Sequence, residues 1–207
     1  PKNLSTIGKQ SFQGCTKVKT IDISAKINSI GDGAFADCAN LTSITVDPTN
    51  TRYTVEDDCL IDIRENKLLQ GLPTSVIPQD GSVTQFGSYC FSGVRITSAV
   101  IPEGVQTIAD NAFRRCNELV NVSLPSTLKN LSATCFAWCP KLAEINLPEG
   151  LERIYTYVFD SCALTNVTIP ASIKEVLENI NQFDIPELDE IDELGAIETD
   201  ISSEDFE

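Results

Sequence analysis

The 207-residue chain contains no histidine and no methionine, and it has a single tryptophan, Trp138. Histidine is the commonest general base and the commonest metal ligand, so its absence argues against most acid–base enzymes and most metal sites. No run of apolar residues approaches the roughly 18 that a membrane-spanning helix needs, so no membrane insertion is predicted for this fragment. The missing initiator Met, with Pro1 in first place, favours a mature or excised fragment.

Positive charge is also scarce, with 15 Lys and Arg against 30 Asp and Glu and a net charge of −15 at pH 7. Such a surface repels phosphate, which argues against nucleic acid as a partner. Every Lys and Arg lies at or before Lys174, whereas 11 acidic residues lie between Asp184 and Glu207. We therefore predict an acidic C-terminal cap and tail over 177–207, partly disordered beyond Gly195.

Phenylalanine recurs at a nearly constant interval along most of the chain. The gaps between successive copies are 23, 56, 22, 23 and 23 residues, from Phe12 through Phe35, Phe91, Phe113 and Phe136 to Phe159. An apolar residue stands five positions before each of them: Ile7, Ile30, Phe86, Ile108, Leu131 and Ile154. In five units a cysteine follows three positions later: Cys15, Cys38, Cys116, Cys139 and Cys162.

Each unit ends in a stretch where apolar and polar residues alternate, often followed by proline, as in Val122-Ser123-Leu124-Pro125. Alternation of this kind is typical of a short half-buried strand, and the proline ends it in a turn. A unit of about 23 residues cannot bury its apolar side alone, but stacked units can, by placing equivalent residues in columns. The repeat therefore predicts a solenoid over residues 1–176.

The repeat resembles the BspA-like, or Treponema pallidum type, leucine-rich repeat over about residues 4–176. The matching positions in one unit are Ile108, Phe113, Cys116, Leu119, Val122, Leu124 and Pro125. The resemblance implies a leucine-rich-repeat solenoid with short parallel β-strands on the concave face and turns or short 3₁₀ or helical pieces on the convex face. It also implies a secreted or cell-surface protein of bacterial type, used in adhesion and host contact.

Residues 49–80 interrupt the repeat. The stretch 58–72, DCLIDIRENKLLQGL, holds two apolar runs around a polar turn at 64–67, which predicts an inserted β-hairpin. We interpret it as a decorated coil, and a flap that contacts a ligand is the alternative.

Eight cysteines raise the question of disulfides or a metal site. Five occupy the repeat column, and Cys90 and Cys135 stand where other units have small apolar residues, which favours free, buried thiols. Zinc sites favour paired cysteines at short spacing, and the pair Cys135 and Cys139 has no second pair and no histidine beside it. A disulfide or a metal is less favoured, and we predict no metal and no cofactor.

Strand residues that alternate with the apolar ones point to the solvent side of the sheet. They are short and polar, and they are the candidate ligand-binding residues: Asp22, Thr45, Ser98, Asn121, Ser123, Glu144, Asn146, Asn166 and Thr168. On the convex side Arg115 and Trp138 hold equivalent positions in consecutive units, where an Arg over the indole could form a contact point. A plain solvated sheet and a packed surface aromatic are the alternatives.

No pair of nucleophile and base stands out. An enzyme without histidine would need paired carboxylates such as Asp57 and Asp58, or Glu144 with a neighbour, and acidic pairs on surfaces are usually only solvated. We predict a non-catalytic surface or secreted module that binds a protein or glycan of a host or neighbouring cell through the solenoid surface. A structural stalk that presents another domain is the second hypothesis, and a carboxylate-based enzyme is the third.

Overall fold

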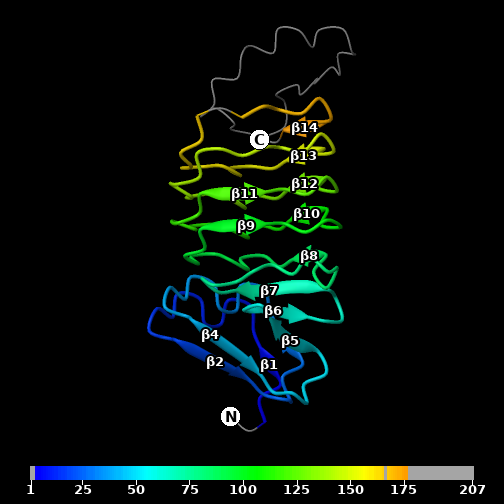
Figure 1. The fold of residues 1–207 in the computed structure, drawn as a ribbon. Coiled ribbons are helices and arrows are strands. Elements are labelled where there is room, and N and C mark those ends of the chain that lie inside the picture. The colour runs from blue at the N-terminus through cyan, green and yellow to red at the C-terminus, as the bar shows by residue number, and fades with distance from the viewer. Residues whose placement is uncertain (1–2, 166, 177–207) are drawn as a thin grey trace, which may run out of the picture.

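The computed structural model describes residues 3–165 and 167–176, and in it the chain winds into stacked coils along one axis (Figure 1). The solenoid of about 23-residue units is thereby confirmed. The predicted cap and tail, and the candidate residue Asn166, lie outside the described residues. Turns join the strands, and no helix occurs in the described part of the chain, so the helical pieces offered as one option for the convex side are not found there.

The predicted strands form one side of the coils, which we call the strand face. They are β2 (Thr20–Ile23), β4 (Ser43–Val46), β9 (Ser98–Val100) and β11 (Asn121–Ser123). β2 pairs with β4, and β9 with β11, in parallel and in the register that the repeat spacing dictates. The strands expected at 144–147 and 167–169 do not form, although Ile145 is still buried between exposed neighbours. Alternation determines which side chains face inward, but a strand also needs a neighbouring backbone close enough for hydrogen bonds between the two.

A second ladder of two-residue strands, which the sequence did not predict, runs along another side of the coils. Its members are β1 (Thr6–Ile7), β3 (Ser29–Ile30), β8 (Gln85–Phe86), β10 (Thr107–Ile108), β12 (Asn130–Leu131), β13 (Arg153–Ile154) and β14 (Glu175–Val176). All but β14 carry the apolar residue that precedes a phenylalanine by five, and β14 carries Val176 in the same register. Equal spacing brings equivalent residues into parallel register, as for Ile108 opposite Leu131.

The repeated phenylalanines stack in a column, as predicted. The ring centroids of Phe91 and Phe113 lie 5.0 Å apart, those of Phe113 and Phe136 5.3 Å, and those of Phe136 and Phe159 6.0 Å. The rings of each pair are within 11° of parallel, and all four residues are buried. Stacked aromatic pairs add roughly 0.5–1.5 kcal/mol to the stabilisation from burial alone.

The turns around each phenylalanine share one backbone form. The residues two before and two after it have positive φ in every unit: Gln10, Gly14, Gly33, Asp37, Tyr89, Gly93, Asn111, Arg115, Thr134, Trp138, Tyr157 and Ser161. This form lets the main chain bond to the next coil. The amide of Phe113 donates to the carbonyl of Cys135 at 2.7 Å, and that of Arg115 to Ala137 at 2.9 Å.

All eight cysteines are free thiols, as predicted, but only five are buried, and Cys15, Cys38 and Cys162 are partly exposed. Those of the repeat column form a ladder of their own, because the Sγ of each of Cys38, Cys116, Cys139 and Cys162 donates to the carbonyl of the phenylalanine one unit earlier, each at 3.1 Å. Burial raises the pKa of the Cys59 thiol to about 12 and the pKa of Cys90 still further. Such thiols stay protonated and serve as packing residues.

The predicted hairpin is present, but it is one part of a three-stranded inserted layer made of β5 (Tyr53–Glu56), β6 (Cys59–Asp62) and β7 (Lys67–Gly71). The three strands pair antiparallel, and β7 pairs with β8 in parallel. Every residue of β6 is buried. Leu60 packs in the core of the N-terminal coils, whereas Ile61 packs in that of the C-terminal coils. The insertion is therefore an internal layer of the solenoid rather than a decoration on one coil.

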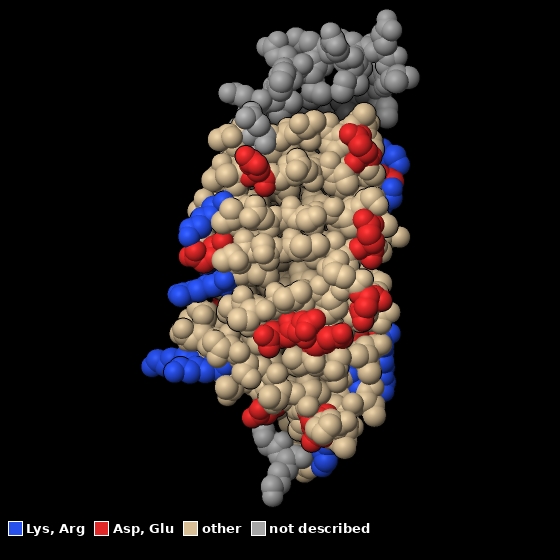
Figure 2. Space-filling view, viewed as in Figure 1, with Lys and Arg blue, Asp and Glu red and all other residues tan. Residues whose placement is uncertain are grey.

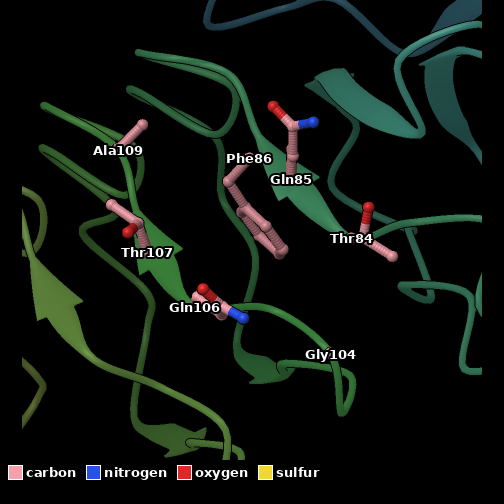
Figure 3. A pocket seen from close by; sticks show the side chains of 7 residues that line it. All are labelled: Thr84, Gln85, Phe86, Gly104, Gln106, Thr107 and Ala109. Carbon is pink, nitrogen blue, oxygen red and sulfur yellow. The ribbon is translucent and has the colours of Figure 1, made fainter.

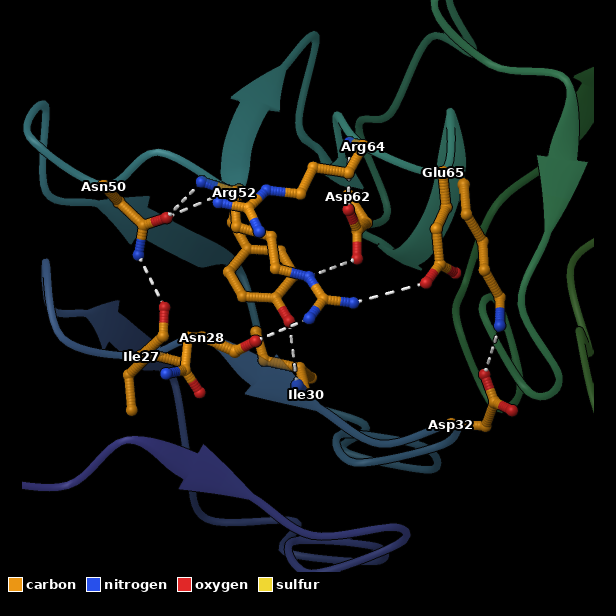
Figure 4. A network of polar contacts seen from close by, with 11 residues as sticks. Ile27, Asn28, Ile30, Asp32, Asn50, Arg52, Asp62, Arg64 and Glu65 are labelled. Atoms are coloured by element: carbon orange, nitrogen blue, oxygen red, sulfur yellow. Dashed lines mark hydrogen bonds and ion pairs between the residues drawn. The ribbon is translucent and has the colours of Figure 1, made fainter.

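Polar contacts tie the inserted layer to the coil before it (Figure 4). The Nε of Arg52 donates to the buried carboxylate of Asp62 at 2.8 Å, and its Nη1 donates to the carbonyl of Asn28 at 2.7 Å. The Tyr53 hydroxyl accepts the amide of Ile30 at 2.9 Å. The bond from Arg52, with one from the amide of Arg64 at 3.0 Å, gives the buried carboxylate of Asp62 its partners.

In the turns around Phe35 and Phe91, the coils before and after the insertion touch directly. The amide of Asp37 donates to the carbonyl of Ser92 at 2.9 Å. Where β7 meets the next coil, a Cβ added to Gly71 would lie 1.9 Å from the ring of Phe91. Only glycine fits there, because the phenylalanine ring occupies the space of a side chain.

Candidate binding surfaces

The strand face presents the candidate residues to solvent. All eight that the structure describes are exposed: Asp22, Thr45, Ser98, Asn121, Ser123, Glu144, Asn146 and Thr168. The inserted layer divides them into two groups, with Asp22 and Thr45 on the N-terminal side and the other six on the C-terminal side. The first two engage each other, because the Thr45 hydroxyl donates to the Asp22 carboxylate at 2.5 Å. The C-terminal group is the larger continuous surface, and its role in binding stays a prediction.

Two exposed valines lie at the border of that C-terminal group that is nearest the inserted layer. Val100 of β9 is 55% exposed, and Val76, at the equivalent position one coil earlier, is 65% exposed. Gln79 donates from its side chain to the carbonyl of Val100 at 3.0 Å and so holds the two coils together there. Sequence reasoning did not include Val76, although aligning 75–78 with 99–102 would have revealed it.

Charge is low on the strand face. Figure 2 shows the face that carries β9 and β11 to be largely free of charged side chains, with acidic side chains along one edge. Acidic residues that are exposed follow the strand segments in the turns: Asp47, Asp80, Glu103 and Glu149. Hydrogen bonds from Thr49 lower the pKa of Asp47, and those from Ser82 lower the pKa of Asp80. The edge therefore stays ionised at neutral pH beside a mostly neutral strip.

The carboxylates that sequence reasoning offered for catalysis have structural surroundings. Asp57 and Asp58 form the turn between β5 and β6, both with positive φ, and Asp58 accepts a hydrogen bond from Thr74 at 2.7 Å. A general acid needs a raised pKa. Among the carboxyl groups whose pKa clearly shifts, every one shifts downward, chiefly through hydrogen bonds from nearby donors: Asp47, Asp80, Glu103, Glu118 and Glu152. In the described residues, no group of three or more His, Cys, Asp or Glu could hold a metal ion.

Arg115 and Trp138 lie together, as their equivalent positions predicted. The guanidinium carbon of Arg115 is 5.6 Å from the centre of the indole, and that of Arg114 is closer, at 4.3 Å. Trp138 is 36% exposed. Sequence reasoning missed Arg114, which follows the phenylalanine at a position that varies among the units, from Ala36 to Asp160. The role of Arg115 and Trp138 as a contact point stays a prediction.

A pocket of about 380 Å³ lies between β8 and β10 (Figure 3). Sequence reasoning gave no sign of it, because it lies on the second ladder, which was not predicted. Its lining residues are Thr84, Gln85, Phe86, Gly104, Gln106, Thr107 and Ala109.

Six copies of the BspA type leucine-rich repeat match the sequence, over residues 1–64 and 66–185. The chain belongs to this family. Among solved structures, a leucine-rich cell surface protein from Faecalibacterium prausnitzii is 30% identical, with a TM-score of 0.74 over 84% of this chain and 47% of that one. A leucine-rich repeat protein from Bacteroides ovatus is 29% identical, with a TM-score of 0.59 over 84% of this chain and 43% of that one.

The pneumococcal vaccine antigen PcpA shares the fold at 16% identity, with a TM-score of 0.63 over 84% of this chain and 48% of that one. The BspA-type chain described here thus spans less than half the length of each of these structures. A search of curated proteins gives no match. In the described residues, no helix has the length and apolar character to cross a membrane.

Proposed function

We propose that this BspA-type solenoid is a non-catalytic binding module, secreted or attached to a cell surface, which contacts a protein or glycan of a host or neighbouring cell. The contact is made by the C-terminal part of the strand face, from Val76 and β9 through β11 to Asn146 and Thr168. The observation that carries the proposal is the mostly neutral strip of exposed short side chains with Val76 and Val100 at its border.

The character of the strip sets the kind of binding expected. Interfaces gain most of their energy from a few apolar or aromatic anchors in a surround of polar contacts. Here Val76 and Val100 supply the apolar part, and Ser123 and Asn146 supply hydrogen-bonding groups. Since no aromatic side chain stands on these strands, we expect a modest affinity that grows when several copies act together. The surface location is supported by the Faecalibacterium prausnitzii relative, whose name calls it a cell surface protein.

The test is a binding screen against immobilised host matrix proteins and a glycan panel, followed by two matched variants. Val100→Arg places a long charged side chain on the strip, and Ile63→Arg places the same side chain at the hairpin turn, where Ile63 is 49% exposed. We expect Val100→Arg to weaken binding by about tenfold or more, with Ile63→Arg and the thermal melting of both variants unchanged. Binding that Val100→Arg leaves intact, or no binding in the screen, would favour a structural stalk.

A further inference from the structure

Apart from the inserted layer, which separates β3 from β8, the second ladder is broken between β8 and β10. The strands β10, β12, β13 and β14 form one sheet, whereas β8 belongs to the sheet of the inserted layer. In the intact ladder the amide of Asn130 donates to the carbonyl of Gln106 at 3.0 Å, and that of Ser132 donates to Ile108 at 2.9 Å. The equivalent bonds from Thr107 and Ala109 to β8 are missing. Main-chain groups on both sides of the gap are therefore left without their ladder partners.

One residue of the repeat is unusual beside the gap. Phe86 occupies a column that holds isoleucine, leucine or valine in the other strands of the ladder. Its ring centroid lies 5.8 Å from that of Phe113 and 6.5 Å from that of Phe91. The larger ring packs against the phenylalanine column at the place where β8 and β10 do not pair.

The pocket in this gap is lined by neutral groups only. The side chains of Gln85 and Gln106 supply amides, and those of Thr84 and Thr107 supply hydroxyls. The amide nitrogen of Gln85 already donates to the carbonyl of Glu65 at 3.1 Å, which leaves its side-chain oxygen as an acceptor, and the Thr107 hydroxyl accepts from the side chain of Asn130 at 3.1 Å. The Gln106 side chain makes no hydrogen bond within the described part of the chain. Gly104 stands at the rim, where an added Cβ would meet only Thr84, at 3.8 Å. The pocket therefore offers both donors and acceptors, and no lining side chain carries a charge.

Size and charge restrict what can enter. An additional strand would need about 9.6 Å between its two neighbours, twice the usual strand spacing, whereas Cα atoms of β8 and β10 lie within 8 Å of each other. The volume of about 380 Å³ is at the small end of ligand sites. An ionised ligand would lose its hydration without gaining a counter-charge.

We propose that the pocket binds one neutral sugar residue, whose hydroxyls bond to the side-chain amide of Gln106, to the side-chain oxygen of Gln85 and to the open main-chain groups of β8 and β10. A sugar ring carries donors and acceptors all around its edge, which matches the mixture of groups in the lining. The site is separate from the strand face, so it does not rest on the function proposed above.

The test is an NMR titration of the ¹⁵N-labelled chain with glucose, galactose, mannose and N-acetylglucosamine, each alone, and with glucuronate as the charged comparison. We expect saturable shifts of the Thr107 and Ala109 amides with at least one of the four neutral sugars. Affinities of single sugars in shallow sites are expected near the millimolar range, so the titrations extend to about 0.1 M. Glucuronate is expected to bind at least tenfold more weakly.

Two matched variants locate the site. Ala109→Tyr fills the pocket, and the chain itself shows that this column accepts tyrosine, because Tyr155 holds the equivalent position two units later. Ser132→Tyr places the same ring one unit away, where β10 and β12 are paired. We expect Ala109→Tyr to weaken sugar binding at least tenfold and Ser132→Tyr to leave it unchanged.

Three results would overturn the proposal: no saturable shift with any of the four sugars, equal binding of glucuronate, or equal effects of the two tyrosine variants. The strand-face variant Val100→Arg should leave the sugar titration unchanged. Failure of the pocket and failure of the strand face are therefore distinguishable.

Discussion

The regular coils and the inserted layer solve the same packing problem in different ways. Between 83 and 164 the coils stack with nearly the same residues in every column, and their cores are hydrocarbon, aromatic rings and thiols. The inserted layer meets a different neighbour on each side and uses residues that appear only once, such as the buried Asp62 and Gln70 and the close-packed Gly71. Identical units fit each other without special chemistry, whereas an irregular layer needs individual solutions at each contact.

The two regions should also differ in how the loss of one side chain affects its neighbours. A column residue is supported by equivalent neighbours above and below, so its loss removes packing but leaves no unpaired charge. A residue of the inserted layer such as Asp62 accepts from two specific donors, the Nε of Arg52 and the amide of Arg64, and its loss leaves these hydrogen bonds unmade. The two regions therefore predict different patterns of mutational sensitivity.

The largest effect is expected in the regular column. Phe113→Ala should lower the free energy of unfolding by about 3–5 kcal/mol, because it empties a fully buried site between two stacked rings. Phe12→Ala should have a far smaller effect, since Phe12 is 40% exposed at the first coil. Urea denaturation of both variants measures the difference. Equal losses would contradict the column.

Gly71→Ala tests the close contact in the inserted layer. The added methyl would overlap the ring of Phe91, so we expect a loss of about 1–3 kcal/mol or more from overpacking. Gly8→Ala is the control, because nothing lies within 4 Å of an added Cβ there. If both variants melt at the wild-type temperature, Gly71 is not a packing requirement.

Asp62→Ala removes the partner of Arg52. The carboxylate is 2% exposed and accepts a charge-assisted hydrogen bond at 2.8 Å, so its loss should lower the free energy of unfolding by about 1.5–3 kcal/mol. Glu65→Ala, which removes the other carboxylate paired with Arg52, should change it by less than about 1 kcal/mol, because that carboxylate is 50% exposed. Chemical denaturation of the two variants gives the comparison, and a reversed order would refute it.

A smaller effect is expected from alkaline pH. The folded pKa of Cys59 is about 12, above its ordinary value of 9.0, because burial disfavours the thiolate. Above pH 9 the unfolded chain releases a proton that the folded chain keeps, so stability falls as pH rises toward 12, by at most about 1.4 kcal/mol per unit from this thiol. Unfolding free energies at pH 8 and pH 10 should differ less in Cys59→Ala than in the wild type. An unchanged difference would show that Cys59 does not contribute.

Much of the regular fold could be predicted because one spacing governs it. The interval between phenylalanines fixed the stacking of Phe113 on Phe136, and the position of the cysteines in the same register indicated free thiols. The alternation in 121–123 correctly placed exposed side chains on the strand face. These features depend on local pattern repeated in columns, which a sequence displays directly.

The inserted layer and the pocket could not be read in the same way. An apolar run such as that in β6 does not reveal whether one face or both are buried, and the burial of Asp62 depends on Arg52 from another strand. The gap beside Phe86 depends on how one ring packs against its neighbours. Positive φ at Arg115 and Trp138 is imposed by the coil and has no signal in those residue types.

Native-state hydrogen exchange tests the central claim most directly, that the inserted layer is an internal layer of the solenoid that joins the N-terminal and C-terminal cores. The amide of Gly71 bonds to Cys90 at 2.8 Å, and that of Phe113 bonds to Cys135 at 2.7 Å. If the layer opens only when the solenoid unfolds, both amides should exchange with the same free energy and the same dependence on denaturant. Exchange of Gly71 through a separate opening of much lower free energy, with Phe113 still protected, would contradict it.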